Sequence, residues 1–378
     1  MVRKIAFIKR GSFSHINASV ASMLQRHFPK YEVTVTDVDQ LLRRHRLGSL
    51  FNLFHIFQLY GGDIARRRRT VQQCYHRTPF MFSRIKTLLA DHFRRDLSSY
   101  AFSFQTQSLY DASVNGLPHF VYTDHTHLAN LYYPGFVPTQ VFAREWIELE
   151  KSLYHRAAKN FTMSRHIQRS LLEQYGCDPG KVACVYAGSN TDTRPVPLEN
   201  DNYRNKTILF IGVDWDRKGG PELAAAFKIV RQHHPDAKLI IVGCSPKLDL
   251  PNCEIAGRVP LERVKDYYAR SSIFCLPTRL EPFGIVFVES LLNKIPIVAT
   301  NIGALPDIVE DGKSGRLVAS HQVGELAAAL LELLADPEKC RRFGEYGHQA
   351  VRERYSWDAV GARIRTEIEA ILGPSVHS

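Results

Sequence analysis

The sequence lacks the features that define several classes of protein. No run of 18 apolar residues occurs among its 378 residues, so we expect no transmembrane helix. The segment Met1–Ile8 is basic and then apolar, but it lacks the longer apolar stretch and the cleavage site of a signal peptide, so we expect a cytoplasmic protein. The seven cysteines are an odd number without a Cys-x-x-Cys pair, which supports neither a disulfide framework nor a zinc knuckle.

The composition that is present is that of a globular protein. The chain is 44% hydrophobic and 23% charged, which excludes disorder, and its length suggests two or three domains. Strand-like and helix-like segments alternate, and the alternation restarts after the proline-rich linker 195–203. The expected strands are 3–9, 31–36, 119–122, 160–164 and 182–186, then 206–212, 238–243, 273–276 and 296–300. The expected helices are 16–27, 142–156 and one ending at 175, then 221–233, 261–270, 287–292 and 323–334.

Two successive strand–helix–strand series predict the fold class. We expect an α/β protein with two Rossmann-like, doubly wound parallel-sheet domains that face one another. In such folds ligands bind at the carboxyl ends of the strands, here in the cleft between the domains. Functional side chains are therefore expected directly after strands.

The net positive charge of the chain lies entirely in its first half. Residues 1–200 hold 26 Lys and Arg against 15 Asp and Glu, whereas the second half is neutral. In the window 42–95, basic clusters such as Arg66–Arg69 flank the apolar stretch Leu50–Tyr60. This pattern is typical of a helix that lies on an anionic membrane surface, although a core helix with a basic edge has the same pattern. We expect no nucleic-acid binding, because no nucleic-acid motif accompanies the charge.

The segment Thr278–Glu289 contains two carboxylates, Glu281 and Glu289, on either side of a glycine turn. Glu281 is expected on the loop after a strand and Glu289 in the following helix. The backbone N–H groups of Gly284, Ile285 and Val286 would then lie at the helix N-terminus, where a phosphate can bind. One carboxylate could hold a sugar and the other a ribose, with a diphosphate between them.

This segment resembles the Glu-x7-Glu signature of family 4 glycosyltransferases, which are retaining enzymes with the GT-B fold. Three further segments resemble the same family, namely Phe210–Gly220, Ile255–Val259 and Asn301–Gly315. The resemblance covers about residues 205–320, and the first half matches only in general plan.

The resemblance implies a retaining transferase that takes its sugar from a nucleotide-activated donor, expected to be a UDP- or GDP-sugar, and needs neither a metal nor a further cofactor. It implies that Glu289 binds the ribose, Glu281 the donor sugar and Lys218 the leaving diphosphate. The other residues expected at the donor are Gly212, Arg217, Arg258, Val259, Gly284, Ile285 and Val286.

One position departs from the family pattern. Many members have Arg where this chain has Val213, so Arg217 or Arg10 is expected to complete the cationic clamp. The nearby Asp214 and Asp216 have the spacing of a metal motif, but two local carboxylates are few for a hard cation, and we interpret them as capping residues.

In the first domain, Asp124 and His125 follow a short strand, and the family often has a His there, near the donor sugar. His127 is the competing candidate, and both histidines could equally be ordinary loop residues. Gly11 and Ser12 follow the first strand, where a short loop can approach a phosphate or the reacting sugar.

The expected domains are an acceptor-binding domain over 1–194, a donor-binding domain over 204–355 and a terminal helix over 356–378 that crosses back to the first. We expect a glycosyltransferase whose acceptor is lipid-linked or a cell-surface glycan precursor, with the protein peripheral on the inner face of the membrane. The alternatives are a sugar-phosphate-forming synthase, a nucleotide-sugar epimerase and a non-catalytic carbohydrate- or membrane-binding relative.

Overall fold

The computed structural model describes residues 2–11, 16–45, 47–189 and 202–373. Two compact units divide the chain. The first unit comprises Met1–Leu131, Phe136–Gly188 and Trp357–Ser378, and the second comprises Tyr132–Gly135 and Ser189–Ser356. Ser12, most of the expected linker 195–203 and Asn190 lie outside the described residues.

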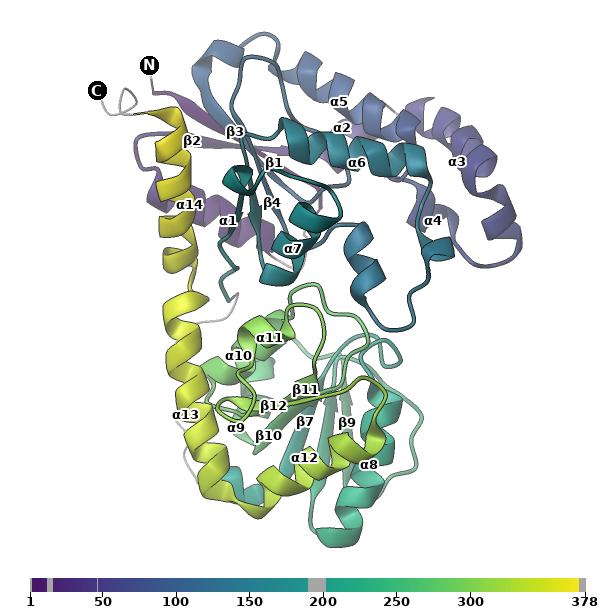
Figure 1. The fold of residues 1–378 in the computed structure, drawn as a ribbon, viewed down its shortest axis with the longest axis vertical. Coiled ribbons are helices and arrows are strands. Elements are labelled where there is room, and N and C mark those ends of the chain that lie inside the picture. Colours follow the sequence, from purple (N-terminus) through teal and green to yellow (C-terminus); the bar gives the residue numbers. More distant parts are fainter. Residues whose placement is uncertain (1, 12–15, 46, 190–201, 374–378) are drawn as a thin grey trace. The chain divides into compact units, whose positions relative to one another are not determined.

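The first unit contains a six-stranded parallel sheet with the order β2-β1-β3-β4-β5-β6 (Figure 1). Its strands are β1 (Lys4–Lys9), β2 (Glu32–Asp37), β3 (Tyr100–Thr106), β4 (His119–Thr123), β5 (Lys159–Thr162) and β6 (Val182–Cys184). Its helices are α1 (Ile16–His27), α2 (Val38–Arg44), α3 (Leu47–Ala65), α4 (Val71–Cys74), α5 (Pro79–Phe93), α6 (Arg144–Arg156), α7 (Arg165–Glu173) and α14 (Trp357–Leu372).

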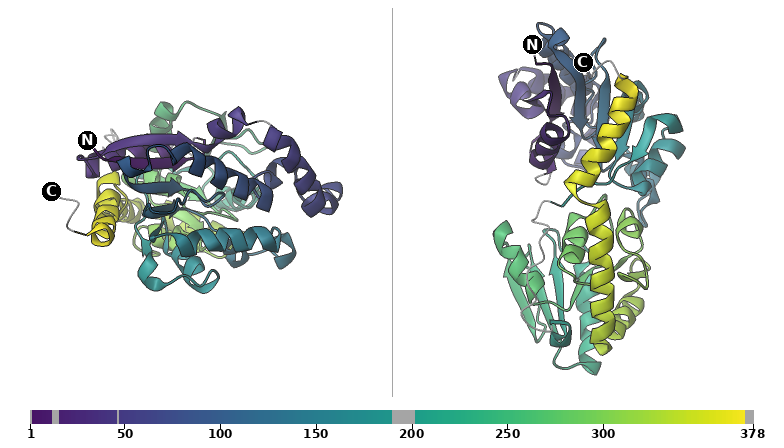
Figure 2. Two further views of the ribbon diagram at one scale, coloured as in Figure 1. Left: turned by 90° about the horizontal axis from the view of Figure 1, so that it is seen from above. Right: turned by 90° about the vertical axis from the view of Figure 1, so that its left-hand side faces the viewer.

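Alternate residues of these strands face two helical layers. Ala6, Ile8 and Val121 face α2, α5 and α6, whereas Phe102 on the other face meets Phe28 at the end of α1. The helix α14, yellow in Figure 2, packs against α1 and β5. Burial on both faces explains why β3 and β4 are buried at every position.

The second unit contains a second six-stranded parallel sheet, with the order β12-β11-β10-β7-β8-β9. Its strands are β7 (Thr207–Ile211), β8 (Lys238–Val242), β9 (Cys253–Gly257), β10 (Ile273–Leu276), β11 (Ile297–Thr300) and β12 (Gly315–Val318). Its helices are α8 (Gly220–His233), α9 (Val264–Ala269), α10 (Ile285–Leu292), α11 (Leu305–Ile308), α12 (Val323–Ala335) and α13 (Pro337–Arg354). The two parallel sheets confirm the predicted fold class.

Most expected elements form within a few residues of their predicted ends, but the expected pattern omits three strands, β3, β9 and β12. The strand β9 lies at a sheet edge and is largely exposed, so its sequence has no long apolar run to mark it.

The apolar stretch in the basic window forms α3. Asn52, Ile56 and Tyr60 are buried, whereas Phe51 and Phe54 are 66% and 69% exposed. Leu50 and Phe57 are exposed as well. The buried and exposed sets lie on opposite sides of the helix, so α3 has one face in the core and one apolar face outside it. No helix in the described part of the chain is long and apolar enough to cross a membrane.

Candidate functional site

The predicted donor residues of the second unit gather at one edge of its sheet. The chain runs outward from β7 through β8 to β9, and outward on the other side from β10 through β11 to β12. The neighbouring strands β7 and β10 therefore flank a topological switch point, where open parallel sheets bind ligands. Gly212 and Lys218 follow β7, and Glu281 follows β10.

Lys218 and Glu281 meet at this switch point. Their side chains form a hydrogen-bonded ion pair between Lys218 Nζ and Glu281 Oε2. Both side chains are mostly buried, with 11% and 6% of their surface exposed. Sequence reasoning gives these residues separate ligands and does not predict that they contact each other.

Two glycines allow the approach of the loop that carries Lys218. Gly219 has a φ of 74°, and a Cβ there would lie 1.9 Å from the carbonyl oxygen of Pro277. A Cβ at Gly220 would lie 2.1 Å from the ring of Trp215. A larger residue at Gly219 would push the loop away from the segment after β10, and one at Gly220 would displace Trp215 within the loop.

The helix α10 begins directly beside Glu281. Gly284 precedes it with a φ of 87°, and a Cβ there would lie 3.0 Å from Glu281 Cγ. The N–H groups of Ile285 and Val286 belong to the first turn and have no partner within the helix. This helix start is thus an anion-binding end next to the ion pair.

Glu289 lies in α10 and is 4% exposed. Burial raises the pKa of Glu289 from its ordinary 4.5 to about 7. Among the described residues, its carboxylate has no hydrogen bond or ion pair. A buried carboxylate without a protein partner is a good acceptor for ligand hydroxyl groups.

The remaining predicted donor residues occupy different places on the same edge. Arg217 contacts Leu280, the residue before Glu281, since its Nη1 donates a hydrogen bond to the backbone carbonyl of Leu280 at 3.0 Å. Val213, the position of the missing arginine, is exposed. Arg258 and Val259 follow β9, two strands from β7 and therefore about 10 Å along the sheet.

Asp214 stabilises the loop that carries Lys218, because it accepts a hydrogen bond from the backbone N–H of Arg217 at 3.1 Å. The expected capping role is wrong, since the N-cap of α8 is Gly219 and no side chain of the described residues caps this helix. Within the described residues, no group of three His, Cys, Asp or Glu side chains could hold a metal ion.

Sequence reasoning missed Tyr133. Its hydroxyl donates to the backbone carbonyl of Glu281 at 3.0 Å, and Gly303 lies against its ring. The segment Tyr132–Gly135 belongs to the second unit although the chain on both sides of it belongs to the first. No local motif marks such an excursion.

In the first unit, His125 follows β4. Its ring Nε2 lies 3.1 Å from the side-chain nitrogen of Asn130, while its buried Nδ1 has no hydrogen-bond partner. Burial, helped by the positive charge of Arg77, lowers the pKa of His125 to about 4. The imidazole is therefore neutral at pH 7, and it is not hydrogen-bonded to Asp124.

His127 has a different environment. Its Nε2 accepts the backbone N–H of Phe142 at 2.9 Å, and its ring contacts those of Phe142 and Trp146. Burial lowers its pKa to about 2. These contacts support a packing role for His127 and leave His125 as the stronger candidate.

The loop after β1 carries Arg10 and Gly11. Gly11 has a φ of 57°, and Arg10 Nε pairs with Asp39 at 3.0 Å. This carboxylate already neutralises Arg10, one of the two residues considered for the clamp.

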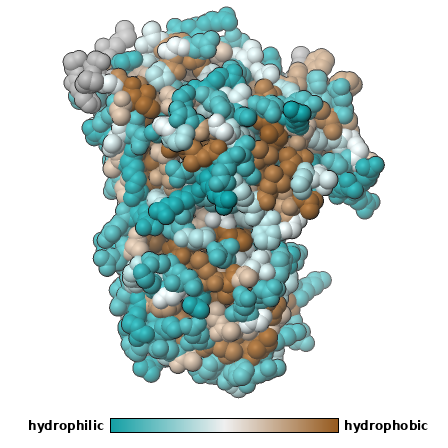
Figure 3. Space-filling view, viewed as in Figure 1, coloured by the Kyte–Doolittle hydropathy of each residue, from teal (hydrophilic) through white to brown (hydrophobic). Residues whose placement is uncertain are grey.

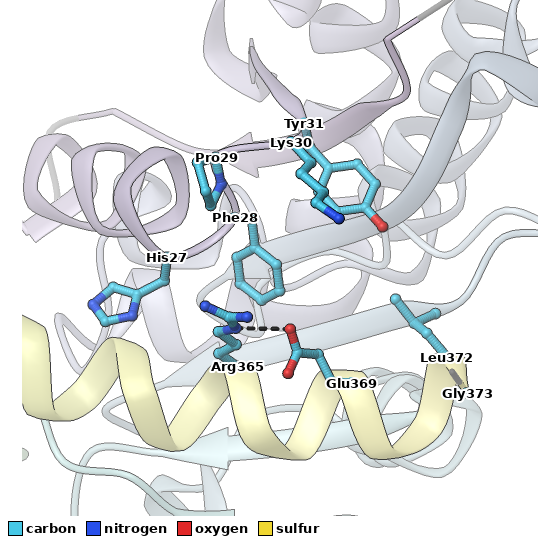
Figure 4. A pocket seen from close by; sticks show the side chains of 9 residues that line it. All are labelled: His27, Phe28, Pro29, Lys30, Tyr31, Arg365, Glu369, Leu372 and Gly373. Atoms are coloured by element: carbon cyan, nitrogen blue, oxygen red, sulfur yellow. Dashed lines mark hydrogen bonds and ion pairs between the residues drawn. The ribbon is translucent and has the colours of Figure 1, made fainter. Parts of the chain in front are cut away.

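Two cavities in the first unit hold none of the residues predicted for the donor or for catalysis, although the larger is lined by Arg68 and Arg69 of the basic window. The smaller, about 100 Å³, lies between Phe28–Tyr31 and the end of α14, where Arg365 and Glu369 pair (Figure 4). The larger, about 640 Å³, lies beside the C-terminal end of α3.

Lys218 and Glu281 lie together at the switch point of a parallel sheet, and comparison with known proteins gives the family that this part of the chain resembles. Residues 196–350, which lie in the second unit, match the family model described as "Glycosyl transferases group 1".

Curated relatives match part of the chain. It is 29% identical over 235 residues to MMP alpha-(1->4)-mannosyltransferase of Mycolicibacterium hassiacum, covering 58% of this chain and 56% of that protein. It is 28% identical over 203 residues to GDP-mannose-dependent alpha-(1-6)-phosphatidylinositol monomannoside mannosyltransferase of Mycobacterium tuberculosis, covering 47% and 53%. The chain thus spans about half the length of the curated relatives it matches.

Solved structures match over nearly the whole chain. Sucrose-phosphate synthase from Thermosynechococcus elongatus has a TM-score of 0.69 at 16% identity, covering 98% of this chain and 99% of that one. Anabaena HepE in complex with UDP and glucose has a TM-score of 0.64 at 16% identity, covering 97% and 100%. This likeness shows the fold, which is the GT-B fold of glycosyltransferases.

Proposed function

We propose that this protein is a retaining, metal-independent glycosyltransferase that moves a sugar from a nucleotide sugar to a lipid-linked acceptor or a cell-surface glycan precursor. The observation that carries the proposal is the buried Lys218–Glu281 pair beside the start of α10, at the switch point of the second sheet. A cation, free helix N–H groups and two carboxylates there match a diphosphate that links a sugar to a ribose.

The chemistry follows from charge. Breaking the bond between sugar and diphosphate leaves negative charge on the phosphate oxygens, and Lys218 with the N–H groups of Ile285 and Val286 would stabilise it. Glu281 would hold Lys218 in place before the donor arrives and accept hydrogen bonds from the sugar hydroxyls. Glu289 would accept the ribose hydroxyls in its buried site.

Names of relatives support a nucleotide-sugar donor, since one is described as GDP-mannose-dependent and one solved structure contains UDP and glucose. We assign the donor to the second unit and the acceptor to the first, whose candidate residue is His125 with its unpartnered Nδ1. A sugar-phosphate-forming synthase is the second candidate, because another relative is named alpha-maltose-1-phosphate synthase, with 26% identity over 246 residues.

The test is a nucleotide-release assay with UDP-, GDP- and ADP-sugars in the presence of EDTA. We expect release from one donor, increased by a detergent-dispersed lipid extract. Release that soluble sugar phosphates stimulate and lipid does not would favour the synthase. No release from folded protein with any donor would contradict the proposal.

We further propose that α3 binds an anionic membrane surface. Its exposed residues Leu50, Phe51, Phe54 and Phe57 form one apolar face, and Arg66 and Arg67 beyond its end are exposed. Figure 3 shows brown, apolar side chains near the end of α6, inward of the place that Figure 1 gives to α3. Apolar insertion and arginine attraction to anionic headgroups act together in such helices.

Replacing Phe51 and Phe54 by serine is expected to weaken binding to phosphatidylglycerol vesicles at least tenfold, because each loses apolar area worth about 1.5–3 kcal/mol. Replacing Arg66 and Arg67 by serine should weaken it about tenfold at low salt. Vesicle cosedimentation measures both. Val35→Ser, on an exposed valine of β2, is the control, and unchanged binding of the phenylalanine variant would refute the role of α3.

A further inference from the structure

The larger cavity of the first unit has a basic floor. It lies beside the C-terminal end of α3, next to α4 and the segment 136–142. Three arginines line it, Arg68, Arg69 and Arg77, against a single carboxylate, Asp63. The cavity is therefore positively charged and, at about 640 Å³, large enough for a small ligand.

Arg69 is held rigidly at the cavity wall. Its side chain is only 8% exposed and pairs with Asp63 at 2.9 Å. Its Nη2 donates to the carbonyls of Gln140 and Val141, and its guanidinium lies 4.0 Å from the ring centre of Phe142. After these contacts, its buried Nη1 still has no hydrogen-bond partner.

Arg77 approaches the same ring. Its guanidinium lies 4.7 Å from the centre of Phe142, and its Nη1 donates to the carbonyl of Gln73 at 2.7 Å. Its buried Nε has no partner, and no carboxylate of the described residues lies within ion-pair distance of it. Burial lowers the pKa of Arg77, which reflects the cost of keeping this charge away from water.

Arg77 is half-buried, and the buried carboxyl of Glu150 acts on its charge without forming an ion pair. A charge taken out of water without a close partner destabilises the protein that carries it. Two pre-positioned guanidinium groups with unpartnered N–H donors suit the oxygens of a phosphate, which arginine binds through paired hydrogen bonds. A bound phosphate would therefore bring a closer counter-charge than Glu150.

The position of the cavity relates it to the acceptor side. Both arginines stack on Phe142, whose backbone N–H donates to His127, and the charge of Arg77 acts on His125. We propose that this cavity binds the phosphate group of a phosphorylated acceptor, held between Arg69 and Arg77. The assignment to the acceptor rests on the proposed function, whereas phosphate binding itself does not.

The test follows thermal unfolding of the full chain with inorganic phosphate and with glycerol 3-phosphate. We expect both ligands to stabilise the wild type in a saturable way, and we expect their dissociation constants to be at least tenfold larger for Arg77→Met. Without ligand, Arg77→Met should be as stable as the wild type or more stable, because it removes an unpaired buried charge. Arg95→Met, on an exposed arginine of the same unit, is the control.

Arg77→Lys keeps the charge and should bind phosphate more weakly than the wild type but better than Arg77→Met. Phosphate binding by Arg77→Met equal to that of the wild type would overturn the proposal. So would a ligand-free loss of stability in Arg77→Met together with full phosphate binding in Arg77→Lys and Arg69→Lys, because the arginines would then be structural.

Vesicles distinguish the two sources of phosphate. If the phosphate belongs to a lipid headgroup, Arg77→Met should weaken binding to phosphatidylglycerol vesicles while α3 is intact. If it belongs to a soluble ligand, only glycerol 3-phosphate binding should fall. Nucleotide release by the wild type tests the proposed transferase function separately, so a failure of that function would appear in that assay and not in phosphate binding.

Discussion

Replacing Lys218 by methionine is expected to lower the rate of sugar transfer about 10²–10³-fold, the usual effect of losing a charged group that stabilises the transition state. The reason is that Lys218 is the buried cation at the switch point, fixed by Glu281 at the start of α10. The nucleotide-release assay with the preferred donor measures the effect. Lys228→Met, on an exposed lysine of α8, the helix that follows the Lys218 loop, is the matched control.

A loss of folding must be separated from a loss of chemistry. Lys218→Met leaves Glu281 buried without its partner, which costs on the order of 3–5 kcal/mol of stability. The double variant Lys218→Met, Glu281→Gln removes both charges and should recover most of that stability while remaining inactive. Near-normal activity in the folded double variant would show that the pair has no part in transfer.

Glu289→Gln is expected to change how stability depends on pH. Below about pH 4.5 the Glu289 carboxyl is protonated in both the folded and the unfolded wild type, so its burial carries no cost of ionisation there and the wild type has its full stability. As the pH rises to about 7 and above, the folded protein must ionise a buried carboxyl, and the wild type should lose about 3 kcal/mol relative to Glu289→Gln.

The affinity for the nucleotide should depend on pH in the opposite direction from the stability of the wild type. The ionised carboxylate is the better acceptor for ribose hydroxyls, so the wild type should bind its nucleotide more tightly above pH 7 than at pH 5.5. Glu289→Gln should bind it at least tenfold more weakly, without this pH dependence. Denaturant unfolding and calorimetric titration across this range measure the two effects, and parallel pH curves for both proteins would contradict the assignment.

The sequence predicts the framework of the fold because buried parallel strands have a clear signal. The apolar strands β7, β8 and β10 form where the pattern places them. Two of them, β7 and β10, flank the switch point. The spacing of Glu281, Gly284 and Glu289 likewise predicts a loop followed by a helix, because a glycine turn and an apolar helical run are local features.

The contacts of the site are less predictable because they join distant segments. Lys218 and Glu281 are 63 residues apart, and nothing in either motif shows that they pair. Tyr133 contacts Glu281 from a short segment, Tyr132–Gly135, that leaves the first unit. Arg77 contacts the ring of Phe142, which is 65 residues away in the sequence, as well as the carbonyl of Gln73. The charge run Arg66–Arg69 also divides, because Arg69 is buried while its three neighbours are exposed.

The measurement that tests the donor site most directly is hydrogen exchange of the full chain with and without the nucleoside diphosphate of the preferred donor. The account predicts slower exchange at the backbone amides of 212–220 after β7, of 257–259 at the end of β9, and of 284–289 at the start of α10. Protection confined to the first unit, or absent while calorimetry shows binding, would contradict it.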